Sequence, residues 1–328
     1  MMAVQSSKEL VRSLFQLRDL SRIPFIPWVG RFAAQLEQID VEEMLSDAGA
    51  LSRALINAQK LFGYDAISTV IDPSLEAEAC GCSIEWRGSG NLPAVTGHPL
   101  ADSASLDTTS FEKRGRVPVV LEAIKRINAI RGKQVAIVGV VTGPLALALH
   151  LRGDALLSDA PQEAAKAITI AGGVALKLAR LYCEAGADVI AISGPTLGQV
   201  PPATLQLVAA PLRSIWNVVH FYNARSLLIT RGCRREHIEP VLALGADGVV
   251  MSGDVDYAEL AKGAAGRKAC WARPVPEAAL LESGSLPADL LANRGKGFFL
   301  STEWEVPYEA SVDRMNDVMR AIGDLHQS

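Results

Sequence analysis

The phrase FGYDA at residues 62–66 returns as AGAD at 185–188 and as LGAD at 244–247, each time directly before an apolar run. In each copy the glycine stands where a helical pattern ends. Glycine readily adopts the left-handed backbone conformation that closes a helix. The phrase therefore predicts a helix followed by a strand, which is typical of alternating α and β units.

Eight short runs rich in β-branched residues recur along the chain and end at Gly, Pro or a polar residue. They predict strands at Ile23–Trp28, Ala66–Ile71, Gln134–Val141, Asp188–Ile192, Ile215–Val219, Gly248–Met251, Lys268–Trp271 and Gly297–Leu300. Helical patterns separate them at Val41–Phe62, Val117–Arg131, Pro161–Ala185, Cys233–Leu244, Tyr257–Ala264 and Glu309–His326. Because the strands are nearly continuously apolar, both of their faces should be buried, which predicts an α/β fold, a (β/α)8 TIM barrel. A doubly wound open sheet is the alternative, but no Gly-x-Gly-x-x-Gly follows the first strand.

The length of 328 residues fits a single barrel domain. We expect an N-terminal helical extension at 1–21 and the barrel at 22–328. The segment Trp86–Glu112 is polar, rich in Gly and Pro, and without clear periodicity. Long loops of this kind are usually functional, so we expect a lid over the mouth of the barrel.

The charge pattern argues against a nucleic-acid or membrane partner. The net charge is −4, the isoelectric point is near 5.8, and Lys and Arg are spread along the chain. The longest apolar run, at 135–151, is too short to span a bilayer, and the first 15 residues do not resemble a signal peptide. The five cysteines form no disulfide pattern. We therefore expect a cytoplasmic protein.

A barrel of this type carries its active site at the carboxyl ends of the strands. The residues that close the predicted strands are Arg31, Asp72, His220, Tyr222, Asn223, Asp254, Arg273, Glu303 and Glu305, and His150 follows in the helix after the third strand. Several have ordinary structural alternatives. Asp72 is also placed to cap a helix, Arg31 to pair with a nearby acid, and His220 to be a hydrogen-bonded core residue. No metalloprotease, nucleophile-elbow or phosphate-loop motif is present, so the residues alone predict a barrel enzyme with an Arg, Asp, His and Glu pocket.

From about Arg22 to Ile322 the chain resembles the uroporphyrinogen decarboxylase superfamily. The resemblance rests on Gly63–Ala66, Asp72–Glu85 (DPSLEAEACGCSIE), Gly139–Ala146 (GVVTGPLA), Ala185–Ile192 (AGADVIAI), Val218–His220 and Leu300–Pro307 (LSTEWEVP). This superfamily includes the decarboxylase of haem synthesis and zinc-dependent methyltransferases that serve corrinoid proteins and thiols.

The decarboxylase branch is matched in part. The resemblance places Arg31 at the second of two carboxylate-binding arginines and Asp72 at the essential aspartate. Pro27 replaces the first arginine, His150 stands at an active-site tyrosine, and Glu303 lies at or near a histidine of the eighth strand.

The methyltransferase branch binds zinc through His-x-Cys after the fifth strand and a later cysteine. Here the first motif reads His220-Phe221-Tyr222, and Trp304 occupies the later position. The resemblance then implies a rebuilt zinc site of His220, Glu303 and Glu305 that acts as a Lewis acid. The turns at Thr142–Pro144, Ser193–Pro195 and Val306–Pro307 favour this branch.

The resulting hypothesis is a methyltransferase that moves a methyl group between a small-molecule substrate and a corrinoid protein docked over the mouth. The hypothesis assigns catalysis to His220, Asp72, Tyr222 and Glu303, and substrate binding to Arg31, Trp28, His150, Ser193 and Asn223. The decarboxylase, which needs no cofactor, and a barrel that binds without turnover are the alternatives. Decarboxylases of this family often dimerise, so a homodimer is a further partner to test.

Overall fold

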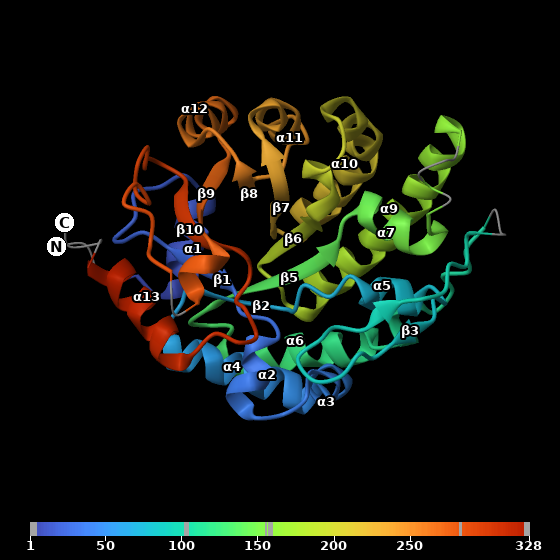
Figure 1. Cartoon of the computed structure of the whole chain (residues 1–328), viewed down its shortest axis with the longest axis horizontal. Helices are drawn as coiled ribbons and strands as arrows, with labels where there is room; N and C mark the ends of the chain where they lie inside the picture. Colours follow the sequence, from blue (N-terminus) through green and yellow to red (C-terminus); the bar gives the residue numbers. More distant parts are fainter. Residues whose placement is uncertain (1–4, 102–104, 155, 157–159, 282–283, 325–328) are drawn as a thin grey trace.

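A computed structural model describes residues 5–101, 105–154, 156, 160–281 and 284–324. Eight parallel strands form one sheet in the order β1-β10-β9-β8-β7-β6-β5-β2. Their bounds are β1 Phe25–Trp28, β2 Ala66–Ser68, β5 Ala136–Thr142, β6 Val189–Gly194, β7 Arg225–Arg234, β8 Gly248–Asp254, β9 Cys270–Val275 and β10 Phe298–Glu305. The two ends of the sheet meet where the Asp65 amide donates to the Phe25 carbonyl oxygen at 2.9 Å. The predicted TIM barrel is thus confirmed (Figure 1).

Helices surround the sheet on the outside (Figure 1). The longer ones are α1 Ser7–Phe15, α4 Ala48–Phe62, α6 Val117–Arg131, α7 Pro144–Arg152, α9 Pro161–Ala185, α10 Gln206–Phe221, α12 Tyr257–Arg267 and α13 Val312–Asp324. Shorter helices are α2 Phe32–Glu37, α3 Val41–Ser46, α5 Ser74–Ala79 and α11 Ile238–Leu242, and the hairpin strands are β3 Ile84–Glu85 and β4 Ala94–Val95. The helix predicted at 41–62 is divided, because Asp47 is extended and its side chain caps α4 by accepting from the Ala50 amide.

The predicted fifth strand is wrong. Residues 215–219 lie inside α10, and the fifth barrel strand is β7. The buried apolar residues of α10 have the spacing of one helix face: Val208, Leu212, Ile215, Trp216 and Val219. The helix predicted from Cys233 also begins later, because Cys233 still pairs with Gly253 in the sheet.

The amino ends of the barrel strands form what we call the floor, and the carboxyl ends form the mouth. Apolar side chains from the strands fill the barrel interior, so the barrel is a packed core. Helix α1, within the expected extension 1–21, packs Val11, Leu14 and Phe15 into this same cluster. It therefore closes the floor.

The repeated phrase of the sequence builds the floor. Its aspartates, Asp65, Asp188 and Asp247, precede β2, β6 and β8 and are called here the floor aspartates. Each accepts a hydrogen bond from a backbone amide on the neighbouring strand segment, from Phe25, Ile137 and Ser226 respectively, at 2.9 to 3.0 Å. The same device thus joins three strand pairs around the barrel.

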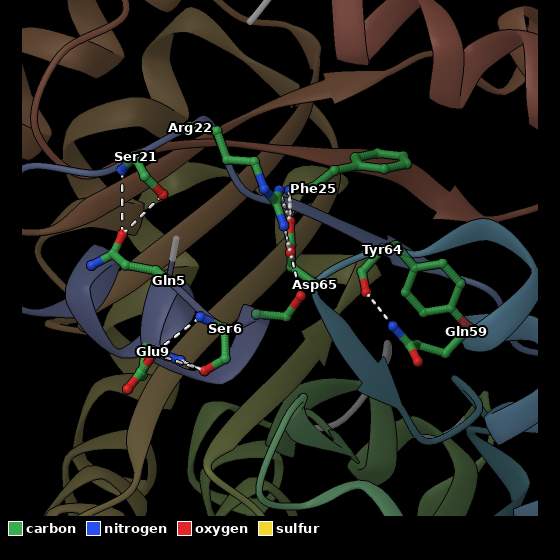
Figure 2. A network of polar contacts seen from close by, with 10 residues as sticks. Gln5, Ser6, Glu9, Ser21, Arg22, Phe25, Gln59, Tyr64 and Asp65 are labelled. Atoms are coloured by element: carbon green, nitrogen blue, oxygen red, sulfur yellow. Dashed lines mark hydrogen bonds and ion pairs between the residues drawn. The ribbon is translucent and has the colours of Figure 1, made fainter. Parts of the chain in front are cut away.

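Helix α1 is anchored to two of these carboxylates. Ser7 Oγ donates to Asp65 at 2.8 Å, and Lys8 Nζ lies 2.8 Å from Asp188. Asp65 also binds the guanidinium of Arg22, as Figure 2 shows beside the amide of Phe25. The contacts explain why α1 stays fixed beneath the strands.

No helix in the described ranges is long and apolar enough to cross a membrane.

Candidate active site

The structure brings most of the predicted site residues together at the mouth. Those that come from the strand ends or the segments just after them are Trp28, Arg31, Asp72, Ser193, Glu303 and Glu305, and α7 adds His150. They derive from five different β/α units, which is the usual origin of a site in this fold.

Three predicted residues are misplaced, because they depended on the wrong fifth strand. His220 ends α10 and its Nε2 lies 2.8 Å from Asp247 Oδ2. Tyr222 donates to Glu184 at 2.7 Å, and Asn223 takes a left-handed conformation after the helix. All three therefore lie at the floor, away from the mouth.

The predicted zinc site of His220, Glu303 and Glu305 is not formed. Strand β8 has seven residues and spans about 20 Å, so a group beside Asp247 is far from the end of β10. The segment that does reach the mouth from β7 is Thr230-Arg231-Gly232-Cys233, with the Cys233 thiol buried against Thr230. In the part of the chain that the structure describes, no three His, Cys, Asp or Glu residues group to hold a metal ion. These donors do not fit zinc, which needs three or four good ligands.

Glu305 and Arg31 form a buried pair on the β1 side of the mouth. Glu305 is 4% exposed, its Oε2 accepts from Arg31 Nε at 3.0 Å, and its Oε1 accepts from the Ile71 amide at 2.9 Å. Burial raises the pKa of Glu305, and the Arg31 charge opposes that rise. Gly30 is required here, because a Cβ at that position would lie 2.0 Å from Glu305 Oε1.

Asp72 is held by a network that the sequence analysis missed. Its Oδ1 accepts from the amide of Ser74, the first residue of α5, at 2.9 Å, and Arg116 donates to Oδ2 at 2.5 Å. Arg116 also donates to Glu78 at 2.8 Å, and its guanidinium lies 5.2 Å from the ring centroid of Trp86. Asp72 is therefore a fixed, fully paired carboxylate.

Glu76 is a second residue that the sequence analysis missed. Its carboxylate is 1% exposed and accepts from the Thr142 amide at 2.6 Å and from Thr142 Oγ1 at 2.8 Å. Burial raises its pKa to about 7. The signal available in the sequence was its place four residues after Asp72 in the motif DPSLEAEACG.

His150 lies near the end of α7 with a partly buried side chain, close enough to His98 and Asp72 for their charges to act on its imidazole. Partial burial lowers its pKa, as does the charge of His98, while Asp72 acts in the opposite direction. Burial and the His98 charge therefore favour the neutral form of the imidazole.

The described part of the predicted lid lies against the mouth. The Gly90 carbonyl accepts from Arg31 at 2.8 Å, Trp86 stacks on Arg116, and His98 Nδ1 lies 2.8 Å from the His150 carbonyl oxygen. Three separate mouth residues thus contact the segment 86–112.

Aromatic side chains line the β10 side of the mouth. Trp28 is fully buried, and its indole Nε1 has no hydrogen-bond partner within the described chain. The Arg231 guanidinium lies 5.6 Å from the ring centroid of Trp304 and binds Glu277 at 3.0 Å. Glu303 accepts from the Glu277 amide at 3.4 Å. Such a site can bind an anionic group at Arg231 and a flat group on Trp304.

Comparison with known proteins decides the family. The family model "Uroporphyrinogen decarboxylase (URO-D)" matches residues 6–285. This chain belongs to the uroporphyrinogen decarboxylase family. The resemblance read from the strand-end motifs is thereby confirmed.

Two curated proteins that are similar in sequence to this chain are named methyltransferases. The chain is 28% identical over 206 residues to methylcobamide:CoM methyltransferase MtbA of Methanosarcina acetivorans, which is 60% of each protein. It is 26% identical over 252 residues to methylcobamide:CoM methyltransferase MtaA of Methanosarcina barkeri, 66% of this chain and 73% of that one. The match therefore spans about 60% of the length of the first relative.

Solved structures support the fold. A methyltransferase from Methanosarcina mazei superposes with a TM-score of 0.84 at 22% identity, over 98% of this chain and 99% of that one. A B12-independent methionine synthase from Shewanella sp. W3-18-1 gives a TM-score of 0.61 at 14% identity, over 85% and 87% of the two chains. At these identities the likeness concerns the barrel itself.

Proposed function

We propose that this member of the uroporphyrinogen decarboxylase family is a methyltransferase that moves a methyl group between a small substrate and a corrinoid protein docked over the mouth. The observation that carries the proposal is its sequence similarity to methyltransferases whose names specify a methylcobamide substrate. The packing of α1 supports the proposal, because it closes the floor of the barrel. A corrinoid protein would therefore dock at the opposite end, over the mouth.

The residues of this chain would bind and orient the small substrate. Arg231 and Trp304 offer a cation and an aromatic face, and the unpartnered indole N–H of Trp28 offers a hydrogen-bond donor to an acceptor atom. The paired Asp72 and Arg116 would keep this wall of the site rigid.

A methylated corrinoid, carried by the partner protein, would supply the methyl group as a cation equivalent and would keep the bonding electron pair. The substrate nucleophile provides the electron pair of the new bond and releases its proton. We assign the acceptance of that proton to His150, because burial favours its neutral form and Asp72 lies close enough to act on its charge. No step is assigned to zinc, since the donors at the mouth do not fit it.

The test is a methyl-transfer assay with methylcobalamin and a panel of thiol, phenol and amine acceptors, in which cob(I)alamin formation is followed by absorbance. We expect turnover with at least one acceptor. Trp28→Phe keeps an aromatic ring but removes the N–H donor together with the second ring of the indole, so kcat/KM should fall at least about tenfold, the effect of roughly one lost hydrogen bond. Absence of methyl loss with every acceptor, from protein that is folded, would refute the proposal.

Decarboxylation is the second candidate, because the two residues matched to the decarboxylase branch both lie at the mouth, where Arg31 pairs with Glu305 and Asp72 with Arg116. Incubation with uroporphyrinogen under anaerobic conditions, with product carboxyl groups counted by mass spectrometry, separates the two activities. Loss of carboxyl groups would favour the decarboxylase. Substrate binding without either reaction would favour a barrel that binds without turnover.

A further inference from the structure

A cavity of about 630 Å³ lies at the floor, between α1 and the starts of the central strands. The charged residues that line it are Lys8, Arg12, Asp188, His220, Arg225 and Asp247. They include two of the three floor aspartates. The cavity is separated from the mouth by the packed barrel interior.

Both aspartates of the cavity already have close partners. Asp188 accepts from the Ile137 amide at 3.0 Å and pairs with Lys8 at 2.8 Å. Asp247 Oδ2 accepts from the Ser226 amide at 2.9 Å and lies 2.8 Å from His220 Nε2. Backbone amides, Lys8 and His220 therefore already bind the carboxylates of both aspartates.

Two arginines that line the same cavity, Arg12 and Arg225, have no carboxylate partner at hydrogen-bond distance in the described part of the chain. The side chain of Arg12 is exposed and makes no ion pair or hydrogen bond with any residue in the described ranges. Arg225 approaches Asp247 Oδ1 only to 3.9 Å, which is beyond hydrogen-bond distance. Two guanidinium groups thus face one cavity without close acceptors.

The cavity also has an apolar wall. Val11 and Phe15 of α1 and Ala136 and Val189 of the strands line it beside the charged residues. A ligand that fits would combine an anionic group with a small apolar body.

We propose that this cavity is a second ligand site, distinct from the mouth, for a small organic anion. Its carboxylate or phosphate binds Arg12 and Arg225, whose planar guanidinium groups suit such oxygens. The apolar body lies along Val11 and Phe15. Because α1 supplies Arg12, the bound anion also holds α1 against the floor and stabilises the folded chain.

The test uses the full chain and four probes: benzoate, phenyl phosphate, inorganic phosphate and the neutral benzamide. Calorimetry gives affinity, and thermal unfolding gives the stabilisation. We expect benzoate or phenyl phosphate to bind and raise Tm, inorganic phosphate to bind more weakly, and benzamide not to bind. The better of benzoate and phenyl phosphate identifies the anionic group.

Variants separate this site from the mouth. Arg12→Gln and Arg225→Gln should each weaken binding at the floor about tenfold, while exposed Arg320→Gln on α13 should leave it unchanged. Because benzoate and phenyl phosphate also suit the cation and aromatic face of the mouth, these variants are compared in an Arg231→Gln background. Equal affinity with and without Arg12→Gln in this background, or equal binding of benzamide and benzoate, would overturn the proposal. So would the failure of all four probes to bind at millimolar concentration. None of these readouts depends on methyl transfer.

Discussion

Glu76 shows how burial changes a single carboxyl group. Its pKa is raised from 4.5 to about 7, so between these values the folded state holds a proton that the unfolded chain releases. The free energy of unfolding should therefore fall as pH rises from about 4.5 to about 7, by an amount on the order of 3 kcal/mol for this group. Above pH 7 its contribution should level off.

Replacement by glutamine tests this. Glu76→Gln mimics the protonated acid, since its amide can accept from the Thr142 amide and donate to Thr142 Oγ1. Urea unfolding measured across pH 4.5 to 8 should show a flatter profile in Glu76→Gln than in the wild type. Glu42→Gln, at an exposed position of α3, is the matched control and should keep the wild-type slope. A wild-type slope in Glu76→Gln would contradict the assignment.

At the scale of secondary-structure elements, each floor aspartate joins two neighbouring strand segments by accepting a hydrogen bond from a backbone amide. Asp65 is the most buried of the three, at 1% exposure, and joins β1, β2, α1 and Arg22. Asp65→Asn removes the charge of a carboxylate that accepts from Ser7, Arg22 and Phe25, and the weakened hydrogen bonds should destabilise the fold by about 2–3 kcal/mol. The Arg22 side chain is 35% exposed and can turn toward water, so no buried charge is left behind.

Asp188→Asn provides the comparison, because the Asp188 side chain is 28% exposed and Lys8 can turn toward water. Its cost should be about 1 kcal/mol or less. Denaturant unfolding of the two variants at one pH measures both values. Equal losses would mean that the floor aspartates act through their backbone hydrogen bonds rather than through burial of charge.

On the scale of the whole molecule, the barrel separates its two ends. Mouth residues should affect activity with little change in stability, and floor residues the reverse. Arg231→Gln at the mouth should lower kcat/KM about tenfold or more while the unfolding midpoint stays close to that of the wild type. His220→Ala at the floor should leave kcat/KM unchanged and cost about 1 kcal/mol of stability.

The methylcobalamin assay and thermal unfolding, applied to both variants, check this separation. A loss of activity in His220→Ala at unchanged stability would return His220 to the active site and contradict its position beside Asp247.

The sequence by itself predicted the barrel, because the signals for each β/α unit are local: a glycine that ends a helix, then an apolar run. The limits of α6 and α9 were predicted to the residue. The fifth strand was misplaced, because the run IWNVV at 215–219, in which four of five residues are apolar, satisfies a strand and a buried helix face equally well.

The sequence also predicted the part of the site that lies at strand ends. Parallel strands carry Arg31, Asp72 and Glu305 to the same edge of the sheet. Only the tertiary structure decided the partners of those groups. Arg116 meets Asp72 across 44 residues of sequence, and Glu76 meets Thr142 across 66. Burial at such contacts sets the charge, pKa and orientation of each group. These properties depend on which distant segments exclude water together, and no local pattern of residues encodes that.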